Sequence, residues 1–288
     1  MIKVALLPAG STSDEAARHL FGDTPVEYRY YSVIADVFLS TVSGETDYSV
    51  IPIENTIEGS VSLHADWLVH EVDLPIQAEW VYPSIQNLIG RLAETAGPDG
   101  SPDFSKITKV FSHPVAMAQC MRFLREYLPH AERETVGSTT EGIRIVKENP
   151  GNGWAAIGTL GGARLHGLDV LRAQVTDHNN NYTRFLLVGR EPFTLRRSDK
   201  AKTSILVTLP EDYPGALHQV LSAFAWRRIN LSRIESRPTK KKLGSYYFFI
   251  DLEMSLETVL LPAAIAEIEA IGCQVRILGS YPSFAWET

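Results

Sequence analysis

Residues 156–167 read AIGTLGGARLHG: an apolar run stops at Thr159, a helical pattern follows, and Gly167 ends it. The same order of strand, small polar residue and helix start occurs five times in residues 1–175. The predicted strands are IKVALL (2–7), DYSVIPI (47–53), IQAEWVY (76–82), KVFS (109–112), WAAIG (154–158) and VLRAQV (170–175). Alternating strands and helices predict an α/β fold with mostly parallel sheets and helices on their faces.

The helix starts carry recognisable signals. Ser13 is a candidate N-cap for a helix that Gly22 closes, Pro114 suits an early helical position, and Ser138 with Glu141 has capping-box spacing. In an open α/β sheet, helix starts at the carboxyl ends of strands face a crevice and offer unpaired N–H groups to anions. Five such starts predict a small anionic ligand. The alternative is that each hydroxyl only caps its own helix. Neither GxGxxG nor GxxxxGK[ST] occurs, so a nucleotide is not indicated.

Composition narrows the class of protein. The 288 residues carry a formal charge of -7, with 44% hydrophobic and 21% charged residues, which is typical of a globular protein and argues against a nucleic-acid-binding surface. The sequence has no stretch suited to a membrane span and no secretory signal, so we expect a cytoplasmic protein. Cys120 and Cys273 have no metal-site spacing and are expected to be buried thiols. No metal or other cofactor is expected.

A second unit follows the charged, aperiodic segment 190–202. Its pattern reads as strand, helix, strand, strand, helix, strand. The corresponding segments are 203–209, 216–226, 230–238, 246–254, 262–272 and 273–279, with a hairpin turn over 239–245. This βαββαβ order predicts a ferredoxin-like α+β domain, in which two helices cover one face of an antiparallel sheet.

Several motifs resemble known families. PIENTIEGSV (52–61), SHPVAMAQC (112–120), AAIG (155–158), HGLDVL (166–171) and NYTRF (181–185) resemble prephenate dehydratases. GAL (215–217) and NLSRIESRP (230–238) resemble the ACT regulatory domain of the same enzymes. No chorismate-mutase-like unit is recognised before the first motif, so the resemblance is to the monofunctional form.

The resemblance implies a two-lobed catalytic domain, similar to periplasmic binding proteins, over residues 1–190. One lobe is expected at about 1–77 plus 178–190 and the other at about 78–175, followed by a linker at 191–201 and the ACT domain at 202–288. The implied reaction converts prephenate to phenylpyruvate, water and carbon dioxide. Arogenate dehydratase, or a non-catalytic sensor of amino acids or keto acids, is an alternative.

The resemblance assigns catalysis to Thr183, Asn55, Glu54 and Arg184. A threonine hydroxyl is a very weak acid, so Thr183 is expected to donate a hydrogen bond to the departing hydroxide rather than to act as a general acid. Arg184 follows Thr183 in a strand and is expected to point away from it, either toward a protein carboxylate or, if the strand bulges, toward the ligand. Glu54 is expected to orient a neighbouring group.

The resemblance places further side chains in the cleft: Ser11, Ser13, Ser112, Gln119, Ser138, Thr139 and Phe185. Two loops depart from the family pattern. The first reads LPAGSTSDEA, with Leu7 in place of a glycine and Thr12 in place of an aromatic residue, and the loop STTEG lacks the usual alanine.

For the ACT-like domain, the resemblance implies that phenylalanine, the end product, binds and gives feedback control. The implied effector-binding residues are Gly215, Ala216, Leu217, Asn230, Leu231, Glu235, Ser236, Arg237 and Pro238. Because ACT sites form between paired domains, a homodimer or homotetramer is expected.

Overall fold

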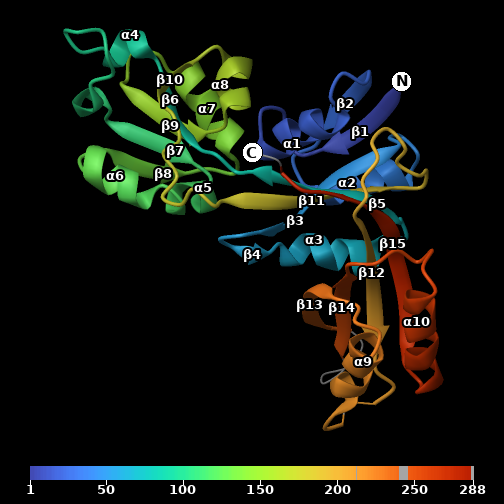
Figure 1. Ribbon diagram of the computed structural model, residues 1–288. Coiled ribbons are helices and arrows are strands. Elements are labelled where there is room, and N and C mark those ends of the chain that lie inside the picture. Colours follow the sequence, from blue (N-terminus) through green and yellow to red (C-terminus); the bar gives the residue numbers. More distant parts are fainter. Residues whose placement is uncertain (212, 240–245, 287–288) are drawn as a thin grey trace. The chain divides into compact units, whose positions relative to one another are not determined.

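The computed structural model describes residues 1–211, 213–239 and 246–286 (Figure 1). Contacts divide the chain into two compact units. The first comprises Met1–Glu71 and Val81–Phe185, and the second comprises Val72–Trp80 and Leu186–Thr288. The chain passes between the units three times: after Glu71, within β5 (Ile76–Pro83) and within β11 (Tyr182–Gly189). The hairpin turn predicted over 239–245 lies, apart from Thr239, outside the described residues.

The first lobe of unit 1 is built on a sheet with the strand order β11-β3-β1-β2. These strands are β1 (Ile2–Leu6), β2 (Val26–Tyr30), β3 (Tyr48–Asn55) and β11, and the short β4 (Gly59–Ser60) pairs antiparallel with the end of β3. β1 is parallel to both neighbours, with Val4 opposite Tyr28 and Tyr48. The helical segments are α1 (Thr12–Phe21), α2 (Ile34–Val42), α3 (Ser62–Asp66) and a π-helical turn, Trp67–Glu71. We call this part lobe 1.

The second lobe of unit 1, lobe 2, has the strand order β10-β6-β9-β7-β8. Its strands are β6 (Asn87–Gly90), β7 (Lys109–Ser112), β8 (Glu132–Thr135), β9 (Trp154–Gly158) and β10 (Asp169–Arg172). Its helices are α4 (Leu92–Thr95), a 3₁₀ turn (Phe104–Lys106), α5 (Pro114–Ala118), α6 (Met121–Tyr127), α7 (Thr139–Glu148) and α8 (Leu160–His166). Helices α7 and α8 lie on one face of this sheet and α5 and α6 on the other (Figure 1).

The two-lobed α/β fold is confirmed, but the sheet of lobe 2 is mixed. β7 is parallel to β8 and β9, whereas β6 is antiparallel to β9 and β10. The sequence prediction also missed β2, β6, β8 and the two-residue β4. β8 reads ERET and is exposed at every position, and β2 reads VEYRY and is only partly buried. Such polar edge strands lack the apolar run by which buried strands are recognised.

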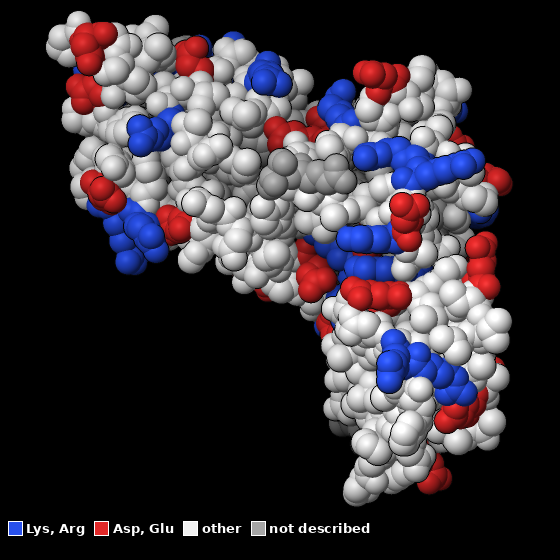
Figure 2. Space-filling model, viewed as in Figure 1, with Lys and Arg blue, Asp and Glu red and all other residues white. Residues whose placement is uncertain are grey.

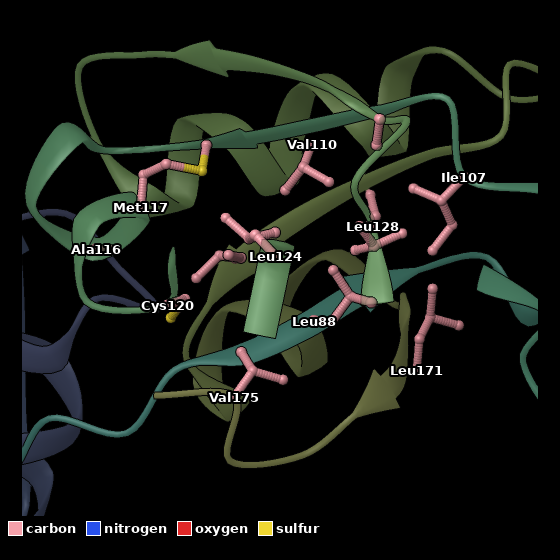
Figure 3. Packing of buried hydrophobic residues seen from close by; sticks show 13 residues of the cluster. Leu88, Ile107, Val110, Ala116, Met117, Cys120, Leu124, Leu128, Leu171 and Val175 are labelled. Atoms are coloured by element: carbon pink, nitrogen blue, oxygen red, sulfur yellow. The ribbon is translucent and has the colours of Figure 1, made fainter. Parts of the chain in front are cut away.

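Strand alternation forms two cores in lobe 2. Leu88, Val110 and Ile157 face α5 and α6, and the next residue of each strand, Ile89, Phe111 or Gly158, belongs to the opposite face. Figure 3 shows Leu88, Val110 and Leu124 of α6 converging in the first of these cores. Cys120 lies there too, and burial raises the pKa of its thiol. Both cysteines are free and buried, as predicted.

Unit 2 has the strand order β13-β14-β12-β15-β5. Its elements are β12 (Ala201–Thr208), α9 (Ala216–Ala225), β13 (Leu231–Pro238), β14 (Tyr246–Leu252), α10 (Leu260–Ala270) and β15 (Gln274–Phe284). Val220 and Phe224 of α9 and Ile268 of α10 pack against Ile205 and Ile250 of the sheet. The predicted βαββαβ order with both helices on one face is therefore confirmed.

The last strand runs five residues beyond its predicted end at 279. Its final residues pair with β5, and Ser283 lies opposite Glu79. Glu79 is buried, accepts a hydrogen bond from Ser283 Oγ and pairs with Lys202 Nζ, each at 2.6 Å. A local pattern does not reveal such a partner about 200 residues away.

Charged side chains of both signs are interspersed on the face seen in Figure 2. Within the described residues, none of the helices combines the length and the apolar character needed to cross a bilayer.

Candidate active site

A cavity of about 560 Å³ lies between the two lobes of unit 1. Lobe 1 contributes the loop before α1, the end of β3 and the start of β11, and lobe 2 contributes the starts of α5 and α7 and the segment after β5. The cavity is lined by Leu7, Pro8, Ser11, Thr12, Ser13, Ser32, Pro52, Asn55, Glu58, Gly59, Ser60, Val61, Ser84, Gln86, His113, Val115, Ala116, Gln119, Gly137, Ser138, Thr139, Thr183 and Phe185. This set, drawn from the described part of the chain, has no lysine or arginine.

Two ten-residue helices begin at this cavity. Ser11 caps α1 by accepting a hydrogen bond from Asp14 N at 3.4 Å, and Ser138 caps α7 by accepting one from Glu141 N at 3.0 Å. Glu141 Oε2 in turn accepts Gly137 N at 2.9 Å, so the predicted capping spacing is used. Helix starts present positive partial charge, so both favour an anion in the cavity.

The cap of α1 differs from the prediction. Ser13 lies inside the helix and is buried, while Ser11 has the extended backbone of an N-cap. The run of hydroxyl side chains at 11–13 does not distinguish the two positions, because either serine can precede an acidic first turn. Both serines nevertheless line the cavity.

The helix start at Thr159 joins the two lobes. Thr159 Oγ1 accepts Gly162 N at 3.0 Å and donates to Gly10 O at 2.5 Å. A Cβ on Gly10 would lie 2.8 Å from Gly162 Cα, and Gly10 has a φ of 72°, so the close approach requires glycine. Glu15 of α1 also accepts Gly161 N at 2.6 Å, and burial raises the pKa of this carboxyl. Thr159 does not line the cavity and is a structural contact between lobes.

The Thr183 hydroxyl is held at the start of β11. Its Oγ1 lies 3.0 Å from Asn55 Nδ2 and 2.6 Å from Ser84 Oγ. Thr183 and Ser84 are 9% and 6% exposed, so both hydroxyls are almost shielded from bulk water while lining the cavity. A buried hydroxyl with two fixed neighbours keeps its orientation, which is what a hydrogen-bond donor to a reacting atom needs.

The orientation of the Asn55 side chain is determined by its contacts. Its Oδ1 accepts the backbone N–H groups of Ile57 and Glu58, at 2.9 and 3.1 Å. Its Nδ2 must therefore face Thr183, and it also lies 2.8 Å from Asn181 Oδ1. Asn181 Nδ2 donates to Gln119 Oε1 at 2.8 Å, which extends the network into lobe 2. The hydroxyl of Thr183 thus belongs to a chain of neutral groups.

Glu54 and Arg184 lie on the other side of the same strands. Arg184 Nη1 is 3.5 Å from Glu54 Oε2, and neither residue lines the cavity. Successive strand residues point to opposite faces, so Glu54 is separated from Asn55 and Arg184 from Thr183 by the pleat. The predicted orientation of Arg184 agrees with this geometry.

The structure brings most of the remaining predicted cleft residues to the cavity. Those that line it are Ser11, Ser13, Gln119, Ser138, Thr139 and Phe185, and Thr12 and Leu7 of the atypical first loop line it as well. Ser112 does not, because it is completely buried and its Oγ donates to Ile157 O at 2.9 Å within the sheet.

Sequence reasoning missed Ser84 and Gln86, which line the cavity from the segment after β5. Both are buried, and Gln86 Oε1 has no hydrogen-bond partner within the described part of the chain. The sequence YPSIQNL gives no helix start or motif at this point, so no local signal separates these two residues from an ordinary loop.

His113 lies at the cavity as the N-cap of α5. Its Nδ1 accepts Val115 N at 3.3 Å, which assigns the ring hydrogen to Nε2 when the imidazole is neutral. A second histidine, His64, donates from Nδ1 to Pro52 O at 2.6 Å and so supports the strand that carries Asn55. Burial is the main cause that lowers the pKa of His64. Among the described residues, His, Cys, Asp and Glu form no cluster of three that would suit a metal ion.

In unit 2 the predicted effector residues form two groups. Leu231 and Thr203 both lie opposite Leu252, so β13 begins at the end of the sheet where β12 begins. Arg237 and Thr208 both lie opposite Tyr247, at the other end. Asn230 and Leu231 therefore belong to one end. The other end holds Gly215, Ala216, Leu217, Arg237 and Pro238, whereas Glu235 and Ser236 lie between the two.

Comparisons with known proteins cover nearly the whole chain. The family model for prephenate dehydratase matches residues 4–193 and that for the ACT domain matches residues 203–270. A prephenate dehydratase of Bacillus subtilis is 36% identical, over 98% of this chain and 99% of that protein.

Two solved structures share the fold over nearly the full length. The crystal structure of prephenate dehydratase from Arthrobacter aurescens, in complex with L-Phe, is 32% identical over 98% of this chain and 90% of that chain, with a TM-score of 0.84. GqqA, described as a novel type of quorum quenching acylase, is 26% identical over 98% of both chains, with a TM-score of 0.83. The extent of the family match and the identity to the Bacillus protein establish that this chain belongs to the prephenate dehydratase family.

Proposed function

We propose that this chain converts prephenate to phenylpyruvate, with water and carbon dioxide as the other products, and that phenylalanine regulates it. In this reaction the ring carboxylate leaves as carbon dioxide and its bonding electrons enter the ring. The ring becomes aromatic as the carbon–oxygen bond breaks, and the departing hydroxide takes up a proton from solvent to become water.

The observation that carries this proposal is the Thr183 hydroxyl, held between Asn55 and Ser84 at the cavity wall. A departing hydroxide gains negative charge as its bond to carbon breaks. A donor already directed at that oxygen binds the transition state better than the ground state. No ionised group is needed at this point.

Prephenate carries two carboxylates, and the cavity suits a dianion without cationic side chains. The starts of α1 and α7 supply backbone N–H groups and hydroxyls, and His113, whose Nδ1 accepts Val115 N, offers its Nε2–H. Within the described lining, Glu58 is the one acidic side chain. We propose that Ser11, Ser13, Ser138 and Thr139 bind the carboxylates and that Gln119 and Phe185 contact the rest of the substrate.

We assign catalysis to residues 1–190 and regulation to residues 202–288, with 191–201 as linker. The lobes are about 1–77 plus 178–190, and about 78–175. The two ends of the ACT sheet are roughly 20 Å apart, since the strands between them have about seven residues at 3.3 Å each. A phenylalanine pocket that uses both Gly215–Leu217 and Asn230–Leu231 therefore takes them from two copies of the chain. We accordingly propose a homodimer, or a tetramer of two such dimers.

The test is to incubate the purified full-length chain with prephenate and to measure phenylpyruvate above the spontaneous rate, with Thr183→Ala as control. The assay is repeated with phenylalanine and with tyrosine, and light scattering gives the mass with and without each. We expect activity, a phenylalanine-dependent change in activity, and a dimer or larger assembly.

Other results would point elsewhere. Faster turnover of arogenate than of prephenate would make the chain an arogenate dehydratase. Tight binding of phenylalanine or of a keto acid, with no turnover, would indicate a sensor. Because an acylase shares the fold, release of an acid from an N-acyl substrate is measured as well, and activity there without activity on prephenate would overturn the proposal. The cytoplasmic location stays a prediction.

A further inference from the structure

Ser84 makes the shortest contact of the Thr183 hydroxyl, with 2.6 Å between the two oxygens. Its backbone is fixed as well, because Ser84 N donates to Asn181 O at 2.8 Å. Ser84 lies directly after β5 and lines the cavity. Ser84 lies in none of the motifs that resemble prephenate dehydratases, and the sequence around it carries no signal of a functional site.

The number of hydroxyl hydrogens available indicates which of the two residues, Ser84 or Thr183, donates this hydrogen bond. Thr183 has one hydroxyl hydrogen and two lone pairs. Asn55 Oδ1 is occupied by the N–H groups of Ile57 and Glu58, so Nδ2 is the donor. Its two hydrogens face three acceptors: Asn181 Oδ1 at 2.8 Å, Thr183 Oγ1 at 3.0 Å and Tyr182 O at 3.1 Å. With the hydrogens on the two nearer acceptors, Asn55 donates to Thr183. If Thr183 donated to Ser84, no hydrogen would remain for the cavity. If Ser84 donates instead, both lone pairs of Thr183 are used and its own hydrogen is directed to the ligand.

We propose that Ser84 is a positioning residue that donates to Thr183 and thereby directs the Thr183 hydrogen toward the departing hydroxide. This rests on the proposed function. When Thr183 donates to the hydroxide, its oxygen becomes more negative, and Ser84 and Asn55 stabilise that charge from behind. No proton needs to leave Thr183, so its side chain needs no acid to reprotonate it, and the departing hydroxide takes up its proton from solvent.

Ser84→Ala is the direct test. We expect kcat for prephenate to fall about tenfold, which is the scale of one hydrogen bond to a partly charged oxygen, with KM within about twofold of wild type. Ser40→Ala is the matched control, because Ser40 is similarly buried and hydrogen-bonded to Tyr31 and Thr46 but lies away from the cavity. Ser40→Ala should lower the melting temperature without changing kcat.

Two backgrounds separate positioning from a general structural role. In Thr183→Ser, which keeps the hydroxyl, Ser84→Ala should again cost about tenfold in kcat. In Thr183→Ala, where no hydroxyl remains to be directed, Ser84→Ala should have no further effect. An equal loss in both backgrounds, or a kcat for Ser84→Ala within about twofold of wild type, would overturn the inference.

These experiments distinguish failure of the proposed function from failure of the proposed role of Ser84. An inactive wild-type chain would reject the dehydratase proposal itself. An active wild type that loses activity with Thr183→Ala but not with Ser84→Ala would reject only the role of Ser84.

Discussion

The two sides of the β3 and β11 strands in unit 1 use adjacent residues for different purposes. On the cavity side, Asn55 and Thr183 form a neutral donor–acceptor pair at 3.0 Å. On the other side, Glu54 and Arg184 form an ion pair at 3.5 Å. Each member of one pair is the sequence neighbour of a member of the other.

The difference shows how one strand can present neutral side chains to the cavity and charged side chains to its opposite face. A carboxylate beside Thr183 would repel a dianionic substrate and would itself accept the Thr183 hydrogen. A neutral amide donates to Thr183 and has neither effect. The pleat allows the charged pair to lie one residue away without entering the cavity. The motif NYTRF therefore combines a hydroxyl at the cavity wall, which we propose as the donor to the substrate, with an arginine that pairs with Glu54.

The largest effect is expected on the cavity side, from Thr183→Ala. Losing one donor to a developing oxyanion typically lowers kcat by about 10² to 10³-fold, because the interaction is strongest in the transition state. Thr183 lies at the cavity wall rather than in a packed core, so the melting temperature should change little. Steady-state kinetics on prephenate with thermal unfolding of the same samples measures both. Thr183→Ser, which keeps the hydroxyl, is the control, and an alanine variant with wild-type kcat would contradict the assignment.

The second largest loss of kcat is expected from Asn55→Asp. The introduced carboxylate keeps an acceptor for Ile57 N and Glu58 N but places a second acceptor where Nδ2 now donates to Thr183. Thr183 would then donate to this carboxylate instead of to the substrate, and the added charge would repel the dianion. We expect kcat to fall by about a hundredfold and KM to rise. Retention of wild-type kinetics would show that the donor from Asn55 is dispensable.

The sequence was sufficient for the parts of this site that follow from local rules. Strands followed by hydroxyls and helix starts led to Ser13 and Ser138, and both line the cavity, whereas Ser11 and Thr139 came from the family resemblance. Strand alternation predicted that Arg184 faces away from Thr183. The βαββαβ order of unit 2 followed in the same way. These features depend on neighbours within a few residues.

Other parts depend on distant residues. Ser84 contacts Thr183 only because β11 brings together two residues that are 99 positions apart in the sequence. Thr159 resembled the other helix caps, yet its hydroxyl reaches Gly10 across the lobes. Ser112 also lies at the end of a strand, but its hydroxyl donates a hydrogen bond to Ile157 O inside the sheet and not to the cavity. The local sequence does not reveal which hydroxyl groups form hydrogen bonds with distant residues of the fold.

On the supporting side, Glu54→Gln should have a small effect. The Glu54 side chain is 41% exposed, so solvent screens its interaction with Arg184, and the loss of stability should be at most about 1 kcal/mol. Because Glu54 does not line the cavity, kcat should stay within about threefold of wild type. Denaturant unfolding and kinetics measure the two quantities. A loss of kcat of about a hundredfold in a stable Glu54→Gln variant would show that Glu54 acts on the substrate and would remove the distinction between the two sides.

The smallest effect is expected on the pH dependence of the free energy of unfolding, through the hydrogen bond from His64 to Pro52 of β3. Burial lowers the pKa of His64 in the folded protein, so between its ordinary value of 6.5 and the lowered value the unfolded chain binds more protons. The stabilising contribution of neutral His64 is therefore present above pH 6.5 and is lost as the pH falls through this window. The loss should be no more than about 1.4 kcal/mol per pH unit.

His64→Asn should flatten this part of the stability profile. An asparagine keeps a donor that can reach toward Pro52 O but does not titrate, so its free energy of unfolding should fall less between about pH 7 and pH 5 than that of wild type. Denaturant unfolding at several pH values measures the difference, with the same substitution at the exposed His130 as the matched control. Parallel pH profiles for wild type and His64→Asn would show that the contact with Pro52 does not depend on the protonation of His64.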